Sequence, residues 1–278
     1  METNISVEDV YYRYPNSSDW ALEDINLTFQ PGEKVAILGS NGSGKSTLAR
    51  LLNGLLIPTQ GKVTVGSWQT QDPQQLMQIR SRVGFLFQNP ENQIVGTTVE
   101  EEIAFGPRNQ GLDPVEVERR VHLTMKMVGL TAYHQVLTNQ LSGGELQRLA
   151  LAGVLVMEPK YLLLDEAFSM LDEPAKGQLL GVLQGYSAQK SLGWINITHD
   201  LSDLVWCQRA IVLNNGKVAY NGLARTLLEE ENRLEAFGLV LPPLHKLLTA
   251  VRAQGVQIPA SIDTKERLVD WIATTVDI

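Results

Sequence analysis

The sequence has little of several features that define whole classes of protein. Among its 278 residues there is one cysteine, Cys207, which excludes an internal disulfide and a cysteine-rich metal site. Basic residues are in deficit, with 23 Lys and Arg against 31 Asp and Glu, so the formal net charge is −8. Because binding along nucleic acid requires clustered Lys and Arg, this balance predicts that the chain has no nucleic-acid partner.

Long hydrophobic runs are also missing. The longest unbroken apolar stretch covers Leu149–Met157. As a helix it would span about 14 Å, against about 30 Å for the hydrocarbon core of a bilayer. The first residues, Met1–Asn4, lack a basic region followed by an apolar stretch, which is the pattern of a secretory signal. We therefore expect a cytosolic chain, and any membrane role must come through a partner.

The first 90 residues have the pattern of strands with a single helix. Apolar alternation and short apolar runs predict strands over 5–11, 22–29, 35–38 and 83–87. The helix is predicted over 45–53. From about residue 89 to 158 the spacing becomes helical, over 99–105, 114–128 and 144–157. This change indicates a helical insertion in an α/β domain.

Strands and helices alternate again after the insertion. The predicted elements are a strand over 161–164, a helix over 174–187, a strand over 194–197, and a hairpin of 210–213 with 217–220. This order implies a mostly parallel sheet with right-handed crossovers. In the last 40 residues we expect one helix from Pro242-Pro243 to Gly255, and another over 264–275 behind a capping box of Asp263 and Glu266.

A glycine-rich stretch between a predicted strand and a predicted helix fits the phosphate-loop pattern G-x-x-x-x-G-K-[ST]. Its residues are Gly39, Ser40, Asn41, Gly42, Ser43, Gly44, Lys45, Ser46 and Thr47. The glycines let backbone N–H groups turn inward as an anion nest, and the helix N-terminus adds positive potential. Lys45 has the length to contact the β- and γ-phosphates, and the Ser46 hydroxyl is suited to bind Mg²⁺.

Two acids end the buried strand that follows the helical insertion. Asp165 and Glu166 come directly after Leu162–Leu164, at the strand end where open α/β sheets bind ligands. With a phosphate loop in the same chain, Asp165 is expected to hold Mg²⁺ and Glu166 to polarise an attacking water.

A second helix N-terminus has the chemistry of a phosphate site. Ser142, Gly143 and Gly144 precede the long apolar helix, and helix N-termini bind anions. If this site lies far from the phosphate loop, the economical arrangement is a dimer, in which each nucleotide contacts the phosphate loop of one chain and the Ser-Gly-Gly of the other. The alternative is a plain N-cap with a glycine hinge.

With these motifs in this order, the sequence resembles the ATP-binding cassette (ABC) ATPases over about residues 5–225. The resemblance implies that Tyr14, or failing that Tyr12, stacks on adenine, and that Gln88 contacts Mg²⁺ and water. It implies that Asp172, in Ser169–Asp172, crosses a dimer interface, and that His199 contacts the γ-phosphate. Ala167-Phe168 departs from the Pro-Thr of many relatives but leaves the neighbouring acid in place.

The resemblance also implies the fold class and the domains. We expect an α/β P-loop NTPase (RecA-like) core with an antiparallel β subdomain, a helical ABC signature subdomain and a small helical C-terminal tail. The ATPase domain would cover 1–225, with the helical subdomain at about 89–158. A C-terminal module for dimerisation or regulation would cover 226–278.

A finer resemblance is to the ATPases of energy-coupling factor (ECF) transporters. It is carried by Phe87–Gln93, by Leu149–Leu155 and by the short helical tail, and Ser169–Asp172 is more similar to the first of the two ECF ATPase types. It implies an ATP- and Mg²⁺-dependent subunit on the cytoplasmic face of the membrane that drives uptake of vitamins or transition-metal ions. Its partners would be a second, non-identical ATPase, a membrane coupling subunit and small substrate-binding membrane subunits.

Two other hypotheses for the function agree with part of the sequence pattern. A conventional ABC importer would use two copies of this chain as a homodimer. A soluble ABC protein of DNA repair or translation needs a long coiled coil or two cassettes in one chain, and neither is present. In either transporter reading, the polar segment 89–96, with Ile94 and Val95 as its apolar pair, is the expected docking surface for the membrane subunit.

Overall fold

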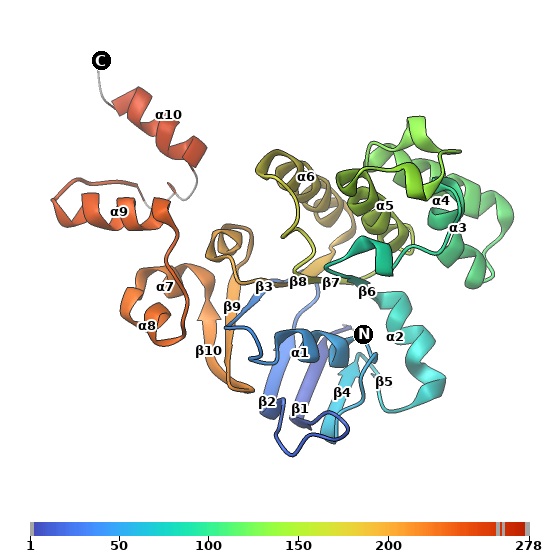
Figure 1. The fold of residues 1–278 in the computed structure, drawn as a ribbon, viewed down its shortest axis with the longest axis horizontal. Coiled ribbons are helices and arrows are strands. Elements are labelled where there is room, and N and C mark those ends of the chain that lie inside the picture. Colours follow the sequence, from blue (N-terminus) through green and yellow to red (C-terminus); the bar gives the residue numbers. More distant parts are fainter. Residues whose placement is uncertain (1–2, 260–261, 263–264, 276–278) are drawn as a thin grey trace.

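The computed structural model describes residues 3–259, 262 and 265–275, and its centre is a six-stranded sheet (Figure 1). The strand order is β10-β9-β3-β8-β7-β6, and all neighbours are parallel except β10 and β9. The strands are β3 (Lys34–Leu38), β6 (Val83–Leu86), β7 (Tyr161–Asp165), β8 (Gly193–Ile197), β9 (Arg209–Asn214) and β10 (Lys217–Leu223).

A smaller antiparallel sheet lies below the first, in the order β2-β1-β4-β5 (Figure 1). Its strands are β1 (Ile5–Tyr12), β2 (Leu22–Phe29), β4 (Gln60–Val65) and β5 (Trp68–Gln69). Helix α1 (Lys45–Leu52) packs between the two sheets, and its Leu48 and Leu51 join one apolar core with residues of both. The helix that follows the phosphate loop is therefore fixed on two sides.

Alternation along the central strands buries both faces of the large sheet. Leu163 of β7 belongs to the core shared with the small sheet, whereas Leu162 and Leu164 pack on the opposite face. That face is covered by α5 (Gly143–Leu155) and α6 (Glu173–Lys190). Strands buried on both faces have continuous apolar sequences, which is why the short runs were readable as strands.

The longest apolar run of the sequence forms most of α5 and is buried on two sides. Ala150 and Leu151 pack toward the sheet, while Leu149 and Ala152 pack into a separate core with α3 (Val99–Asn109) and α4 (Pro114–Met127). A helix that is apolar all round is a buried one. This helix therefore joins the helical region to the sheet.

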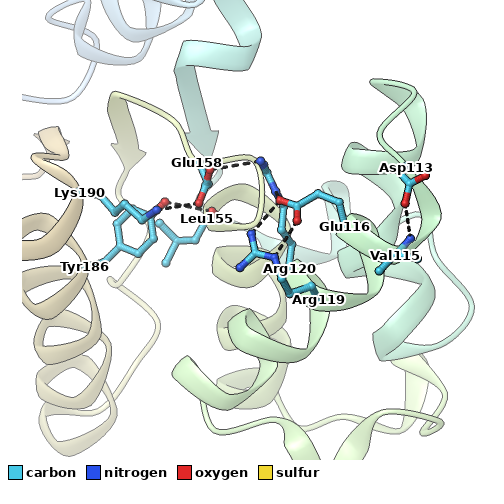
Figure 2. Close-up of polar contacts among 9 residues, drawn as sticks. All are labelled: Asp113, Val115, Glu116, Arg119, Arg120, Leu155, Glu158, Tyr186 and Lys190. Carbon is cyan, nitrogen blue, oxygen red and sulfur yellow. Dashed lines mark hydrogen bonds and ion pairs between the residues drawn. The ribbon is translucent and has the colours of Figure 1, made fainter.

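Polar side chains add a second connection between the helical region and the core, shown in Figure 2. Arg120 of α4 pairs with Glu158 at 3.3 Å, and Glu158 pairs with Lys190 at the end of α6 at 2.9 Å. The Tyr186 hydroxyl donates to the carbonyl of Leu155 at 3.3 Å. The carboxylate of Glu158 thus bridges α4 and α6.

The C-terminal part contributes four helices within the described residues: α7 (Ala224–Glu229), α8 (Glu231–Ala236), α9 (Pro243–Ala253) and α10 (Lys265–Thr275). Helix α7 packs on the sheet core, whereas α9 and α10 extend away from it and share an apolar cluster that includes Leu248 and Trp271 (Figure 1). The predicted capping box of Asp263 falls outside the described residues. Across residues 3–259, 262 and 265–275, no helix has the length and apolar character needed to cross a bilayer.

Most predicted elements are confirmed, but some expectations were wrong and some elements were missed. The first 90 residues hold a second helix, α2 (Leu76–Arg82), which buries only Ile79 and so lacks an apolar stripe. The helix expected over 99–105 continues to Asn109 through the buried Pro107. Strands β4 and β5 and helices α7 and α8 were not expected. The hairpin prediction was right, because Asn215 and Gly216 both have positive φ, as a tight two-residue turn requires.

Candidate functional site

The phosphate loop joins β3 to α1, and its glycines are required by space as well as by conformation. Gly39 has φ +144°, and a Cβ there would collide with the carbonyl of Leu213. At Gly44, φ is +104°, and a Cβ would lie 2.7 Å from the carbonyl oxygen of Ala21. The loop is therefore locked into a curve that L-residues with side chains cannot follow.

Lys45 extends back inside this loop. Its Nζ donates to the carbonyls of Gly39 at 2.8 Å and Ser40 at 3.0 Å, and the residue is 5% exposed. Burial lowers the pKa of Lys45, while the nearby carboxylates of Glu166 and Asp165 oppose the shift. A desolvated ammonium held by backbone carbonyls in a nest is placed to meet a phosphate.

Ser46 and Asp165 meet across 119 residues of sequence. The Ser46 hydroxyl donates to Asp165 Oδ1 at 2.7 Å. Burial raises the pKa of Asp165, and the hydrogen bond from Ser46 acts in the opposite direction. The two side chains together offer a compact pair of oxygen atoms beside Lys45.

Glu166 lies in a strained backbone conformation at the end of β7. Its φ is +50°, in the left-handed region, and its N–H donates to the carbonyl of Ile197 on β8 at 3.0 Å. For a residue with a Cβ this conformation costs about 1–2 kcal/mol. It turns the carboxylate toward Gln88, whose Nε2 donates to Oε2 at 3.2 Å, and toward His199, whose Nδ1 lies 3.6 Å from Oε1.

Lys45, Ser46, Gln88, Asp165 and Glu166 share one pocket of about 550 Å³, whereas His199 borders a neighbouring pocket of about 130 Å³ that Glu166 also lines. The larger pocket is lined by Tyr14, Ala21, Asn41, Gly42, Gly44, Lys45, Ser46, Thr47, Gln88, Asp165 and Glu166. Tyr14 is 39% exposed, and its hydroxyl shares a 2.9 Å hydrogen bond with Thr47 Oγ1. Tyr12, the other aromatic considered, is 6% exposed and lies in the core, where it contacts the edge of Tyr14.

The other predicted site residues do not line this pocket. Ser142 caps α5 and forms a capping box with Glu145, whose pKa falls to about 2 because Tyr133 and Ser142 donate hydrogen bonds to it. A Cβ added at Gly143 or Gly144 would meet nothing within 4 Å. Asp172 is the exposed N-cap of α6 and accepts a hydrogen bond from Ala175 at 2.9 Å.

The segment after Gln88 differs from the predicted docking surface in two of its residues. Val95 is 65% exposed, but Ile94 is half-buried and packs against the core of the helical region. The Gln93 side chain bonds internally, accepting from the Phe87 N–H at 3.4 Å and donating to the Ala150 carbonyl at 3.3 Å. It therefore connects the end of β6 to α5.

Two polar contacts near the site were not predicted from the sequence. The buried carboxylate of Glu102 on α3 accepts from the N–H groups of Val95 at 2.8 Å and Gly96 at 2.6 Å. Lys176 on α6 pairs with Asp203, beyond His199. Both contacts join residues that no local motif relates. An acid facing two backbone N–H groups is recognisable only after the chain is folded.

Comparisons with known proteins agree with this geometry. The ABC transporter family model matches residues 22–169. The chain is 41% identical to the energy-coupling factor transporter ATP-binding protein EcfA of Syntrophomonas wolfei, over 96% of this chain and 98% of the relative. Their similarity therefore extends beyond the family model into the C-terminal part.

Two solved structures share the fold. That of cbiO1 from Clostridium perfringens, described as part of the ABC transporter complex cbiONQ, has a TM-score of 0.77 and 32% identity, covering 90% of this chain and 100% of that chain. The cassette MJ0796, solved as a dimer in a post-hydrolysis state with ADP and phosphate, has a TM-score of 0.70 and 28% identity, covering 79% and 98%. The predicted fold class is thus confirmed, and the chain belongs to the ABC transporter family, as an ATP-binding ATPase of the energy-coupling factor type.

Proposed function

We propose that this chain hydrolyses Mg²⁺-ATP as one of two cassettes of an ECF-type importer, and that the released energy drives uptake of a vitamin or a transition-metal ion. One observation carries the catalytic part of the proposal. Lys45, Ser46, Gln88, Asp165 and Glu166 come from three segments of the sequence and line the same pocket.

Each group has a distinct task in breaking the bond between the β- and γ-phosphates of ATP. The loop N–H groups and Lys45 hold the phosphates and offset the charge that develops on the γ-phosphoryl group. Glu166 orients a water for in-line attack on phosphorus and accepts its proton. Gln88, within hydrogen-bond distance of Glu166, positions that water, and His199 contacts the γ-phosphate.

Mg²⁺ fits the oxygen pair of Ser46 and Asp165. Within the described residues, no three His, Cys, Asp or Glu side chains gather in a cluster that holds a metal ion by itself. Mg²⁺ does not need such a cluster, because it commonly binds one or two protein oxygens together with water and substrate phosphates. When bound, it neutralises charge on the β- and γ-phosphate oxygens.

The two-cassette arrangement is supported by the glycines at the start of α5. Neither Gly143 nor Gly144 has positive φ, and neither would collide with any atom of this chain if it carried a Cβ. The fold of the single chain therefore gives no reason for glycine here. Close approach of a nucleotide held by a partner cassette gives one, since a backbone without side chains exposes its N–H groups. The dimeric solved cassette agrees with this arrangement.

The partners proposed for the complex are a second, non-identical ATPase, a membrane coupling subunit and small substrate-binding membrane subunits. The chain would lie at the cytoplasmic face of the membrane, bound through the exposed part of the segment 89–96. The similarity to EcfA over nearly the whole of both chains supports this assembly.

Purification of the tagged chain from detergent-solubilised membranes tests the assembly. Mass spectrometry should find a second cassette and small membrane subunits, and the complex should hydrolyse ATP only with Mg²⁺ present. A complex that contains this chain as its sole cassette would contradict the non-identical pair. Turnover that persists in excess EDTA would contradict the Mg²⁺ site.

A further inference from the structure

Lys176 connects two segments that each carry a candidate site residue. It lies in the first turn of α6, where its backbone N–H donates to the carbonyl of Asp172 at 2.9 Å. Its ammonium lies 2.5 Å from Asp203 Oδ1 and 3.3 Å from Asp200 Oδ2. Asp200 directly follows His199. One side chain thus joins the turn of Asp172 to the loop of His199.

This contact is more shielded from water than the other lysine pairs. The side chains of Lys176 and Asp203 are 13% and 11% exposed, whereas Lys190 on the same helix is 51% exposed. Burial by itself lowers the pKa of Lys176, but the carboxylates of Asp203 and Asp200 outweigh it and leave the pKa above its usual value. Lys176 therefore stays charged and paired.

The acids that hold Lys176 are themselves fixed to the sheet and the loop. Asp203 accepts a hydrogen bond from Asn196 of β8 at 3.1 Å, and Asp200 caps the short helix after His199 by accepting from Ser202 at 2.9 Å. Lys176 and both acids line one small pocket of about 130 Å³ that Glu166 and His199 also border. The network consequently lies directly beside the candidate catalytic acid.

We propose that Lys176 is a positioning residue that transmits docking of the partner cassette at Asp172 to the loop of His199. A shift of the first turn of α6 moves the lysine, and the lysine moves the two acids that follow His199. The proposal rests on the proposed function, in which Asp172 faces the partner and His199 contacts the γ-phosphate. In this proposal, Lys176 contacts neither ATP nor the attacking water.

Steady-state ATPase kinetics of the purified two-cassette complex test this role. For Lys176→Met we expect kcat to fall about ten- to hundredfold, since small misplacements of reacting groups cost this much, while KM for ATP stays unchanged. Lys176→Arg keeps the charge and should restore most of kcat. Lys190→Met is the matched control, because it removes an exposed lysine pair of the same helix (Figure 2). Unchanged kcat in Lys176→Met overturns the proposal.

A milder variant guards against misfolding. Asp200→Asn removes one of the two charges that face Lys176, and Asn is as good an N-cap as Asp. It should lower kcat less than Lys176→Met, with the thermal midpoint unchanged. In a double-mutant cycle, Asp172→Ala should lower kcat by a smaller factor in the Lys176→Met background than in the parent. The reason is that both changes interrupt the same connection between Asp172 and the loop of His199. Additive losses overturn the transmission role.

Lys45→Ala separates the two proposals in the same assay. Turnover that survives Lys45→Ala overturns the ATPase site and the role of Lys176 with it. Turnover that is lost with Lys45→Ala but kept with Lys176→Met overturns only the role of Lys176.

Discussion

The nucleotide pocket and the helical region are built in different ways. The pocket is made of loops at the ends of short, fully buried strands, and its groups are fixed by backbone: the curve at Gly39, the strained Glu166 and the nest around Lys45. The helical region has its own apolar core and meets the sheet through α5 and through polar side chains such as Gln93 and Arg120.

This difference separates groups fixed by the backbone from a region that meets the sheet partly through polar side chains. The strands beneath the pocket belong to packed cores, which are dense and resist deformation. Polar side-chain bonds at the surface of the helical region are individually weak and can exchange with water. Changes in the pocket should therefore abolish chemistry, and changes in the helical region should alter how that chemistry is used.

The largest effect is expected at Lys45. Lys45→Ala removes a charge-assisted phosphate contact from the buried nest, so nucleotide binding should weaken and hydrolysis should be abolished. Binding of a fluorescent ATP analogue and phosphate release would be measured on the same complex. Lys62→Ala, at an exposed pair with Glu8, is the control and should behave as the parent. Normal turnover in Lys45→Ala would defeat the assignment of the site.

Glu166→Gln should preserve ATP binding and slow hydrolysis by about 10²- to 10³-fold, the usual size of a general-base effect. Because ATP then stays unhydrolysed, a closed dimer should accumulate. Turnover and the dimer fraction in size-exclusion chromatography would be read together. Fast turnover, or slow turnover without a trapped dimer, would count against Glu166 as the base.

The next effect should appear at the site built on the partner chain. Ser142→Arg should lower hydrolysis at that site about a hundredfold, as when one preorganised donor is removed, and leave ATP bound at this chain's Lys45. Photocrosslinking of an azido-ATP to each cassette distinguishes the two sites. Loss of ATP at Lys45 would mean that the helix acts within its own chain.

Gly144→Ala tests the same partner-chain site and adds only one methyl group. Open space surrounds Gly144, so the change should not lower the thermal midpoint, yet turnover of the complex should fall. Gly185→Ala on α6 is the matched control, since a Cβ there also meets nothing within 4 Å. Equal turnover in the two variants would show that the nucleotide site does not require glycine at the start of α5.

What the sequence predicted well is what lies close together along the chain. The phosphate loop, the Asp165-Glu166 pair and the hairpin at Asn215-Gly216 each carry their geometry in consecutive residues. The contact of Lys176 with Asp203 and that of Gln93 with α5 could not be predicted, because each depends on how distant helices pack. The exposure of Ile94 was misjudged for the same reason, since its partner surface belongs to the helical region.

A smaller and more selective effect is expected in the exposed part of the segment 89–96. Asn92→Ala with Val95→Ala should lower uptake into vesicles several-fold while basal ATPase stays near the parent, because both side chains lie outside the pocket. Met77→Ala on α2, at 70% exposure, is the control for losing an exposed apolar side chain. Surviving uptake, or an equal fall in both activities, would show that another surface couples to the membrane subunit.

Gln93→Ala sharpens that prediction, because Gln93 bonds inside the chain. It should affect ATPase and uptake together by loosening the connection between Phe87 and α5. If Gln93→Ala lowered uptake alone, as expected for the double change at Asn92 and Val95, the internal hydrogen bonds of Gln93 would not explain its role.

The smallest effect should come from the charge bridge of Figure 2. Arg120→Met removes the pair with Glu158 and the pair with Glu116 inside α4. It should lower the free energy of unfolding by about 1 kcal/mol or less for each, the usual worth of partly exposed pairs. Leu163→Ala, in the fully buried core of β7, should lower it by about 2–5 kcal/mol. Urea denaturation of both variants gives the comparison. Arg120→Met should also leave ATP turnover near the parent, because none of the pocket groups contacts this bridge. If Arg120→Met cost as much as Leu163→Ala, the charge bridge would stabilise the chain as strongly as the buried core, and the contrast between the two regions would fail.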